Sequence, residues 1–382
     1  MKIAPFKVEQ WMNAYENDAI YNLAETCIDS LTVEELLRLC GQDPAAYFHE
    51  FAATRLTYSH IFGSPELLAG IAGLYETPVP ADNIVPTHGA AGANHQAIIS
   101  LLGPGDSMVC LVPTYQQHYS IPESVGAEVR TLALQPQNGF APDLAQLEAL
   151  VTENTKLISI NTPNNPTGAV LDKAQLAAIA EIARRAGAWV LSDEVYRGIS
   201  ADGSYMPSIV DVYEKGISVC SMSKVFSLAG LRLGWLATRD AAAAQLFKER
   251  RDYDTISCGV LDDKLAALAL AHKDAIWARG REIVLKNRKL LDDWVASEPR
   301  VWYVAPQGGN TALIFYDADV KSRALCQQLL QETGVFYTPG ECFDLEYCWR
   351  IGYAFDSETL AEGLARTSAF LHTLPKRDGA KQ

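Results

Sequence analysis

The feature that most constrains the fold is an alternation of short apolar runs with longer helix-period runs, from residue 64 to residue 285. Parallel strands need a long crossover between them, usually a helix, and the sheets they form are covered by helices on both faces. The alternation therefore predicts an α/β domain built around a mostly parallel, seven-stranded sheet. The predicted strands are 83–86, 107–113, 128–133, 156–161, 188–193, 216–221 and 233–238.

Two helix starts are marked by capping residues. Ser64 stands before Pro65, which places a capping hydroxyl ahead of a proline at the first helical position. Asp172 followed by Gln175 matches a capping box. Both signals predict helices that cover the sheet.

The chain after residue 285 changes to a pattern typical of a smaller α+β unit. The predicted strands are 302–305, 312–316 and 349–353, and the predicted helices are 322–333 and 357–374. Residues 1–45 carry helix signals of their own and are expected to pack with this part. We therefore predict a large domain over 46–284 and a small domain built from 1–45 and 285–382.

Composition limits the expected partners. The formal net charge is −14 and the isoelectric point is near 5.0, so neither nucleic acid nor an anionic membrane is an expected partner. No apolar run approaches the ~20 residues that cross a bilayer, and the first residues show no signal-peptide pattern. The eight cysteines are scattered without a Cys-x-x-Cys pair, so we expect free thiols and no metal site. A cytoplasmic enzyme acting on a small molecule fits these limits.

Lys224 follows directly on the predicted strand 216–221, in the sequence Ser-Met-Ser-Lys, and Arg232 comes eight residues later. Lysine is among the residues least often buried. A lysine amine in a desolvated, cation-rich pocket has a lowered pKa and can form a Schiff base with a carbonyl compound. The alternative is an ordinary surface-loop lysine. Arg232 could bind a phosphate through two parallel hydrogen bonds.

Other motifs lie at the carboxyl ends of neighbouring strands, where α/β sheets bind their ligands. Residues 87–93, Thr-His-Gly-Ala-Ala-Gly-Ala, let backbone N–H groups approach a phosphate at a helix start, although small residues also serve close packing. Asp193 ends a strand whose apolar start predicts burial. Its carboxylate then needs a cationic partner such as a pyridinium nitrogen, or it caps a helix. Tyr196 could reach the phenolic oxygen of the same ring.

Three further positions suit a planar, anionic ligand. In residues 161–168, Asn-Thr-Pro-Asn-Asn-Pro-Thr-Gly, two prolines force a sharply turned backbone, and an Asn amide there can donate to a phenolate oxygen. Tyr115 can lay its face on an aromatic ring, or is an ordinary loop residue. Arg350 stands inside an apolar strand and needs a carboxylate, either from a substrate or from a protein Asp or Glu.

These motifs, in this order, resemble those of the pyridoxal-phosphate (PLP) dependent aminotransferases of class I and II, which have fold type I. The resemblance extends from about Tyr58 to Tyr353. The matching residues are Tyr58 with Gly63, Gly89-Ala90-Ala91, Tyr115, Asn164-Asn165-Pro166-Thr167-Gly168, Asp193 with Tyr196, Ser221-Met222-Ser223-Lys224, Arg232, Pro339-Gly340 with Phe343, and Arg350.

The resemblance implies how the ring of pyridoxal 5'-phosphate is held. Lys224 would bind the cofactor as a Schiff base and then act as general base on the substrate Cα. Asp193 would pair with the pyridinium nitrogen and keep it protonated. Asn165 and Tyr196 would donate to the phenolic oxygen, and Tyr115 would stack on the ring.

The resemblance also implies the surroundings of the phosphate and of the substrate. The phosphate would be surrounded by Gly89, Ala90, Ala91, Ser221, Ser223 and Arg232. Arg350, with Asn165 beside it, would hold the substrate α-carboxylate. Tyr58 would reach the phosphate bound by a neighbouring subunit, which implies a homodimer with shared active sites.

One segment departs from the family pattern. Residues 21–30 stand where such families usually carry a glycine-containing loop over the substrate, yet they hold no glycine and two acids, Glu25 and Asp29. The segment is either a helix start capped by Asp29, Ser30 or Thr32, or a wall where Glu25 or Asp29 meets a cationic substrate side chain. The second reading suits arginine or a derivative, because related PLP enzymes that cyclise hydroxyarginine have altered N-terminal segments.

Four classes of function are weighed against these motifs. The leading one is an aminotransferase acting on an α-amino acid and a 2-oxo acid. The alternative is a PLP-dependent lyase or cyclase, eliminating at the β or γ carbon of an arginine derivative, or a racemase, because the same α-carbanion serves all of them. A DNA-binding regulator of this fold is excluded, because no helix-turn-helix domain fits before Tyr58 and the net charge is −14. A dinucleotide-binding protein lacks its Gly-x-Gly-x-x-Gly motif.

Overall fold

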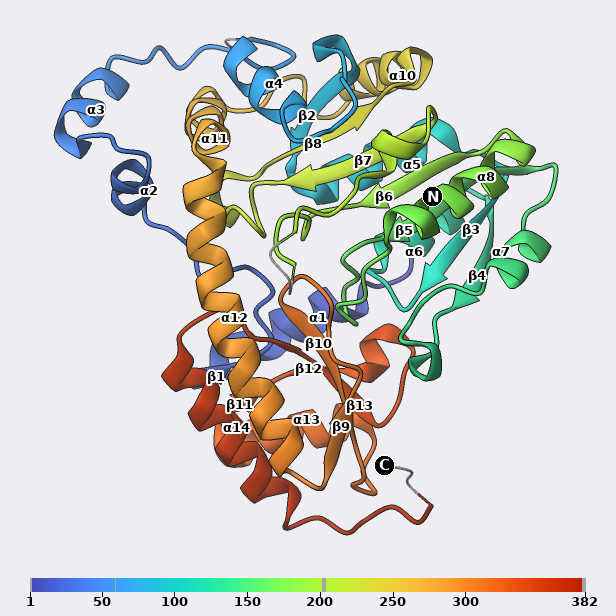
Figure 1. The fold of residues 1–382 in the computed structure, drawn as a ribbon, viewed down its shortest axis with the longest axis vertical. Helices are drawn as coiled ribbons and strands as arrows, with labels where there is room; N and C mark the ends of the chain where they lie inside the picture. Colours follow the sequence, from blue (N-terminus) through green and yellow to red (C-terminus); the bar gives the residue numbers. More distant parts are fainter. Residues whose placement is uncertain (1, 59, 201–203, 380–382) are drawn as a thin grey trace.

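The computed structural model describes residues 2–58, 60–200 and 204–379. Two parts stand one above the other in Figure 1, a seven-stranded sheet with its helices and a smaller part with two small sheets. The longest helix, α12 (Lys273–Ser297), runs from one part into the other. The predicted domain boundary at residue 284 lies inside α12, so the division into 46–284 and the rest stays a prediction.

The large sheet has the strand order β2-β8-β7-β6-β5-β3-β4. Its strands are β2 Ile84–His88, β3 Ser107–Val112, β4 Glu128–Ala133, β5 Thr155–Asn161, β6 Trp189–Asp193, β7 Gly216–Ser221 and β8 Leu233–Thr238. Only β8 runs antiparallel to its neighbours β2 and β7. The predicted mostly parallel α/β sheet is therefore confirmed, with β2 extending two residues beyond the predicted end.

Both faces of this sheet are buried, because neighbouring residues of a strand point to opposite sides. On β6, Val190 packs with the core under α4, α8 and α11, whereas Leu191 packs with the core under α5, α6 and α10. These helices are α4 Pro65–Ala72, α5 Gly89–Leu101, α6 Gln117–Ser124, α8 Lys173–Ala186, α10 Ala241–Arg251 and α11 Val260–Ala271. Strands buried on both sides explain the continuous apolar runs in the sequence.

The predicted helix caps form in the structure. The Ser64 hydroxyl accepts from the backbone N–H of Leu67 at 3.1 Å, at the start of α4. Asp172 and Gln175 form the capping box of α8. The remaining helices of the large part are α7 Leu144–Leu150 and α9 Ile209–Val212, and its 3₁₀ turns are η2 Ala81–Asn83, η3 Pro136–Asn138 and η4 Ala229–Leu231. The 3₁₀ turns η1 Glu16–Asp18 and η5 Gly340–Phe343 belong to the smaller part.

The smaller part joins the two ends of the chain. Its sheets have the orders β12-β13-β10-β9 and β1-β11. Its strands are β1 Tyr21–Asn22, β9 Val301–Tyr303, β10 Thr311–Tyr316, β11 Val335–Phe336, β12 Thr338–Pro339 and β13 Cys348–Gly352, and its helices are α1 Lys7–Tyr15, α13 Ser322–Thr333 and α14 Ser357–Leu371. The pairing of β1 with β11 ties residues 21–22 to the C-terminal part, as expected for the N-terminal segment.

Two short helices stand away from the body at one side of the molecule, α2 (Val33–Leu39) and α3 (Pro44–Phe51). None of the α3 residues is fully buried, and an extended segment leads from α3 to α4. Large apolar side chains lie exposed along this arm: Phe48, Leu56, Tyr58, Ile61 and Phe62. Among the described residues, no helix is long and apolar enough to cross a membrane.

Candidate active site

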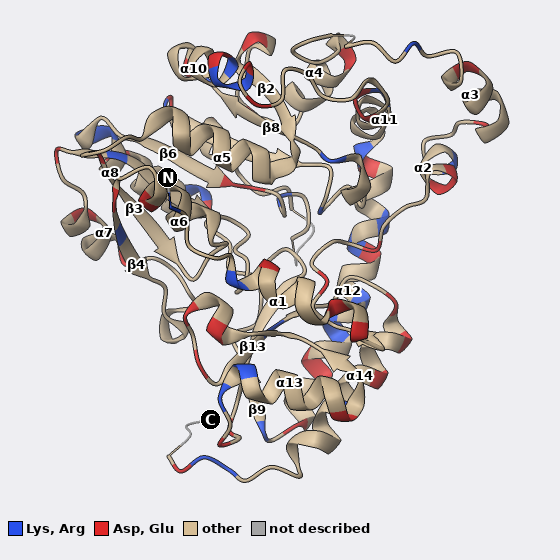
Figure 2. Cartoon of the chain, turned by 180° about the vertical axis from the view of Figure 1, so that it is seen from behind, with Lys and Arg blue, Asp and Glu red and all other residues tan. Residues whose placement is uncertain are grey.

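A cavity of about 310 Å³ lies where the parallel strands end, between the large sheet and the N-terminal segment. Helix α1 crosses this junction between the two parts (Figure 2). Among the residues that line the cavity are Glu9, Glu16, Glu25, Thr26, Cys27, Ala90, Ala91, Asn94, Tyr115, Asn161, Asn165, Asp193, Tyr196, Ser221, Ser223, Lys224, Arg232 and Arg350. The fold thus gathers almost every predicted site residue in one place.

The first turn of α5 meets Arg232 at one end of the cavity. Gly89 has φ 65°, and a Cβ there would lie 2.8 Å from Arg232 Nη2. Gly234 on β8 is needed for the same approach, because its Cβ would lie 2.7 Å from the backbone N of Ala90. Arg232 also donates to the Ser223 hydroxyl at 3.3 Å. Unpaired N–H groups of a helix start beside a guanidinium form an anion site, as the phosphate prediction requires.

Lys224 follows β7 and turns its amine toward the N-terminal segment. Its Nζ donates to the Thr26 hydroxyl at 2.7 Å and lies 3.5 Å from Cys27 Sγ. Burial by itself lowers the pKa of Lys224, but Cys27, Tyr196 and Glu25 outweigh it, so the pKa stands above its usual value. The expectation of a lowered pKa in a cation-rich pocket is wrong for this arrangement, because three groups of acidic character surround the amine.

Asp193 ends β6 with its carboxylate facing the cavity. It accepts from the Asn94 side-chain amide at 2.9 Å and from the backbone N–H of Val195 at 3.2 Å. His118 Nε2 lies 3.5 Å from the same carboxylate, and His118 Nδ1 lies 2.7 Å from the Ser159 hydroxyl. This setting favours the tautomer with its proton on Nε2. The carboxylate is thus held in place while remaining open to a cationic ring nitrogen.

Sequence reasoning missed Asn94 and His118. Asn94 lies on α5, one turn beyond the predicted phosphate residues, and His118 lies three residues after Tyr115. Their helical spacing from predicted site residues was the available signal. Asn94 and His118 lie 99 and 75 positions before Asp193 in the sequence. Their contacts with Asp193 therefore depend on how α5 and α6 pack on the sheet.

The turn after β5 carries two asparagines with different tasks. Asn161 donates to the backbone carbonyl of Asp193 at 2.9 Å and accepts from the backbone N–H of Asn165 at 2.6 Å. Asn165 Oδ1 accepts from Arg350 at 3.3 Å, which leaves the Asn165 side-chain N–H₂ on the cavity wall. Tyr196 is 2% exposed, its hydroxyl has no partner in the described part of the chain, and burial raises its pKa. The Asn165 side-chain amide and the Tyr196 hydroxyl are therefore two donors that can bind one acceptor in the cavity, as the prediction of a phenolic oxygen requires.

Arg350 on β13 is a buried cation. Its guanidinium donates to the Ala24 carbonyl at 3.0 Å and to the Thr338 hydroxyl at 2.9 Å. Within the described ranges no carboxylate forms an ion pair with it, and its Nε has no partner. Burial lowers the pKa of Arg350 because it disfavours the charged form. A buried cation favours an anionic partner, and the assignment of Arg350 to the substrate carboxylate stays a prediction.

Tyr115 lines the cavity, with its hydroxyl donating to Glu9 on α1 at 2.6 Å. Its ring packs against Phe6, with centroids 4.7 Å apart. Burial raises its pKa, so the hydroxyl stays protonated. The stacking of this ring on a cofactor stays a prediction, and the contact with Glu9 was not anticipated from the sequence.

The two acids of residues 21–30, the segment that departs from the family pattern, lie in different surroundings. Glu25 lines the cavity and accepts from the backbone N–H groups of Thr26 and Cys27 at 2.8 and 2.7 Å. Burial raises its pKa, but Lys224 and these hydrogen bonds outweigh burial, so the pKa is lowered. Asp29 lies outside the cavity lining and pairs with Arg279 at 2.9 Å, so its suggested contact with substrate is wrong.

The suggested caps and Tyr58 lie outside the cavity. Thr32, with Glu35, forms the capping box of α2, so this one of the three suggested caps is the cap observed. Tyr58 is 64% exposed and borders a surface hollow together with Cys258 and Gly259. Its predicted contact with a neighbouring subunit stays a prediction.

The residues present fit the cofactor that the motifs imply. The helix start with Arg232 suits the phosphate, the Asp193 carboxylate suits a protonated ring nitrogen, and the unpartnered Tyr196 hydroxyl suits a phenolic oxygen. Lys224 is the one lysine among the described residues that line the cavity. The unpaired Arg350 adds a place for the carboxylate of an amino acid.

Comparisons with known proteins agree with this arrangement. A solved structure of a PLP-dependent aminotransferase from Streptococcus suis 89-1591 is 43% identical, with a TM-score of 0.95 over 99% of this chain and 100% of that chain. Capreomycidine synthase of Streptomyces vinaceus is 30% identical over 368 residues, covering 96% of this chain and 93% of that protein. An aspartate aminotransferase of Pyrococcus horikoshii is 29% identical over 329 residues, covering 81% of each.

Residues 29–366 match the family model of the aminotransferases of class I and II. This range holds every predicted cofactor residue, from Tyr58 to Arg232, and Arg350. The chain therefore belongs to the class I and II aminotransferase family of fold type I, and its cofactor is pyridoxal 5'-phosphate.

Proposed function

We propose that the protein is an aminotransferase acting on an α-amino acid and a 2-oxo acid. The observation that carries the proposal is a single cavity holding the Lys224 amine, the Asp193 carboxylate and the unpaired Arg350 guanidinium. Bound PLP supplies the electron sink that acidifies the Cα–H bond of an amino acid. Arg350 binds the α-carboxylate, and the Lys224 amine takes the proton from Cα.

The substrate side chain is proposed to be cationic. Three glutamates, Glu9, Glu16 and Glu25, line the side of the cavity formed by the N-terminal segment. Glu9 is fixed by Tyr115, and Glu16 accepts from the Asn22 side chain at 3.1 Å. A carboxylate wall favours arginine or a derivative and disfavours aspartate, because like charges repel.

The second candidate is a PLP-dependent lyase or cyclase acting on an arginine derivative. Two observations favour it: the acidic wall, and the likeness to capreomycidine synthase over nearly the whole chain. In that reaction a leaving group departs from the β or γ carbon, and the amino group stays on the product. In transamination the amino group passes to the cofactor instead.

Single amino acids mixed with holoenzyme, without a 2-oxo acid, separate the two candidates. Transamination converts the cofactor to pyridoxamine phosphate, removes the visible band and releases a stoichiometric 2-oxo acid. Elimination with cyclisation gives multiple turnovers while the band persists, and the product keeps its nitrogen. A panel with arginine, hydroxylated arginine, alanine and aspartate tests the substrate class in the same experiment.

Glu25→Gln tests the acidic wall, because it removes the charge and keeps the shape. The KM for arginine is expected to rise about 10- to 100-fold, the loss of a charge-assisted hydrogen bond worth ~1.5–3 kcal/mol. Alanine is the control substrate, because it has no cationic side chain and makes no such hydrogen bond with Glu25. Its KM is expected to change less than about 2-fold. If KM changes equally for arginine and alanine, Glu25 interacts with the Lys224 amine and not with the substrate side chain.

The functional unit is proposed to be a homodimer with shared active sites, located in the cytoplasm. Leu56 is 80% and Tyr58 64% exposed on the apolar arm beyond α3, which suits burial against a second copy. All eight cysteines are free thiols, as is typical of reducing compartments.

Mixing two inactive variants tests whether the sites are shared. Lys224→Ala removes the amine of one site, and Tyr58→Phe removes the hydroxyl proposed to reach the phosphate of the other subunit. Co-refolded mixtures are expected to regain activity, because each mixed dimer holds one site with both residues intact. No recovery in a mixture that sedimentation shows to be dimeric would place Tyr58 in the site of its own subunit, and an active Tyr58→Phe variant would place it outside the site.

A further inference from the structure

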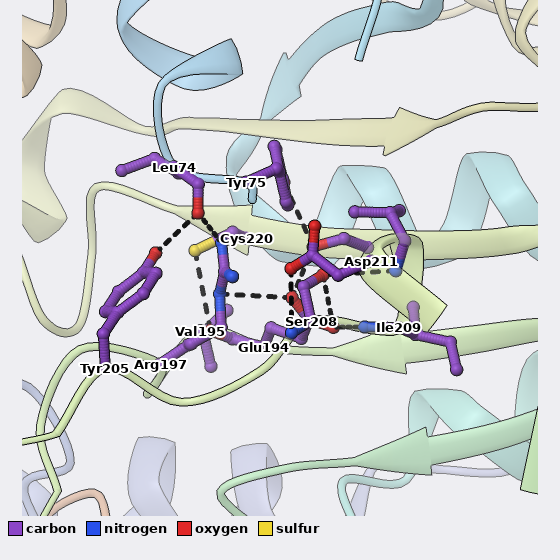
Figure 3. Close-up of polar contacts among 12 residues, drawn as sticks. Leu74, Tyr75, Glu194, Val195, Arg197, Tyr205, Ser208, Ile209, Asp211 and Cys220 are labelled. Atoms are coloured by element: carbon purple, nitrogen blue, oxygen red, sulfur yellow. Dashed lines mark hydrogen bonds and ion pairs between the residues drawn. The ribbon is translucent and has the colours of Figure 1, made fainter. Parts of the chain in front are cut away.

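The segment from Asp193 to Arg197 sends its side chains to two opposite sides. Asp193 and Tyr196 line the cavity. Glu194 and Arg197 are 0% and 3% exposed and lie away from it, in a buried polar network (Figure 3). Neither Glu194 nor Arg197 is among the residues lining the cavity.

Both oxygens of the Glu194 carboxylate are fully used. Oε1 accepts from the Ser208 hydroxyl at 3.0 Å and from the backbone N–H of Ile209 at 2.9 Å, at the start of α9. Oε2 accepts from the Ser218 hydroxyl of β7 at 2.8 Å and lies 3.3 Å from Arg197 Nε. One carboxylate thus joins the end of β6 to α9 and to β7.

The Arg197 guanidinium continues the network toward the chain beyond α4. It donates to the Leu74 carbonyl at 2.9 Å and lies between the rings of Tyr75 and Tyr205, 4.8 and 4.7 Å from their centroids. Tyr205 donates to the same Leu74 carbonyl at 3.0 Å (Figure 3). The Tyr75 hydroxyl closes the network by donating to Ser218 at 3.1 Å.

Stability alone does not account for this pair. Taking two charges out of water is costly, and apolar residues of similar volume often replace a buried ion pair without loss. What such a pair does add is a fixed direction for each partner, because its hydrogen bonds tolerate little displacement. Here the two partners are the second and last residues of the turn that carries Asp193 and Tyr196, and the backbone N–H of Arg197 also donates to the Glu194 carbonyl at 2.9 Å.

We propose that Glu194 and Arg197 are positioning residues for the cofactor ring. From the far side of the turn they hold the Asp193 carboxylate and the Tyr196 hydroxyl at a fixed separation, one for the ring nitrogen and the other for the phenolic oxygen. The proposal concerns how the PLP cofactor is held and assumes no particular substrate or reaction. It therefore stands or fails independently of whether the enzyme transaminates or cyclises its substrate.

Glu194→Gln tests the proposal, because it removes the charge and nearly keeps the volume. The pH midpoint of the visible band is expected to rise by about half a unit or more, since a displaced Tyr196 no longer withdraws charge from the phenolic oxygen. The dissociation constant of PLP is expected to rise, and kcat to fall about 10- to 100-fold for a displacement on the order of 1 Å, with KM changing far less. The melting temperature is recorded alongside.

The buried Arg300–Asp317 pair of the smaller part provides the matched control. Asp317→Asn breaks a buried ion pair remote from the cavity, so it is expected to lower the melting temperature without moving the midpoint. If Glu194→Gln lowers the melting temperature as Asp317→Asn does but leaves midpoint and PLP affinity unchanged, the pair is structural and the proposal is wrong.

Two further variants keep the test decisive. The double variant Glu194→Leu with Arg197→Met is expected to recover part of the melting temperature and to keep the shifted midpoint. Arg197→Lys serves if Glu194→Gln is not recovered folded, because lysine keeps the charge but loses the stacking between the two rings. An unshifted midpoint in Arg197→Lys would likewise overturn the proposal.

Discussion

Lys224→Ala is expected to yield a folded protein without the visible band of covalently bound cofactor and with turnover at least about 10³-fold lower. Lys224 is the one lysine lining the cavity within the described residues, so no other amine there can bind the cofactor covalently. The same amine is the proposed general base, a role worth about 10²- to 10⁴-fold by itself. Absorbance after loading with PLP and dialysis against cofactor-free buffer measures the first effect, and single-turnover rates measure the second.

Lys215→Ala is the matched control, because Lys215 lies outside the cavity lining, where it donates to the Gly187 carbonyl and contacts the Trp189 ring. It is expected to keep both the band and the rate. Added ammonia or methylamine is expected to restore part of the Lys224→Ala activity by supplying the missing amine. A visible band that survives dialysis in Lys224→Ala would refute the assignment of this residue.

Asp193→Asn is expected to lower kcat about 10- to 10³-fold at neutral pH. An adjacent carboxylate raises the pKa of a protonated ring nitrogen, and its removal lowers that pKa by about 1–3 units. A lowered pKa means less protonated ring at neutral pH, so the deficit is expected to shrink as the pH falls. The pH profile of kcat measures this, and the amide still accepts from Val195.

Two comparisons isolate the charge of Asp193. Reconstitution with N-methylated PLP, whose ring nitrogen is permanently positive, is expected to restore part of the rate in Asp193→Asn. Asp29→Asn, which changes an acid outside the cavity, is expected to leave the profile unchanged. A deficit in Asp193→Asn that is equal at every pH would point to lost geometry instead of lost charge.

The sheet and most element ends were predictable because their signals are local. Apolar runs set the strands, and Ser64, Asp172 and Gln175 mark helix starts through contacts within three residues. The reversal of β8 had no such signal. It depends on η4 (Ala229–Leu231) turning the chain back after Lys224, with Arg232 at φ 49°.

The order of the motifs along the chain was enough to predict the family, the cofactor and most of the residues that the structure gathers in one cavity. Most of the motifs lie at the end or the start of a strand of the large sheet, and parallel strands bring their carboxyl ends to one edge. What the sequence did not determine is which groups meet the Lys224 amine. Thr26 and Cys27 lie 198 and 197 positions away from it. Burial lowers the pKa of Lys224, but Cys27, Tyr196 and Glu25 outweigh burial and raise that pKa, contrary to expectation.

By itself, then, the sequence determined the fold class, the PLP cofactor and the likeness to aminotransferases, because these follow from local patterns and motif order. The tertiary structure alone decided that Glu9, Glu16 and Glu25 form one acidic wall, while Asp29 is turned away to Arg279. It also decided that Glu194 and Arg197 form a buried ion pair outside the cavity that Asp193 and Tyr196 line. Such contacts depend on how α1, α4 and α9 pack against the sheet, and no local pattern encodes the distance between segments that meet only on folding.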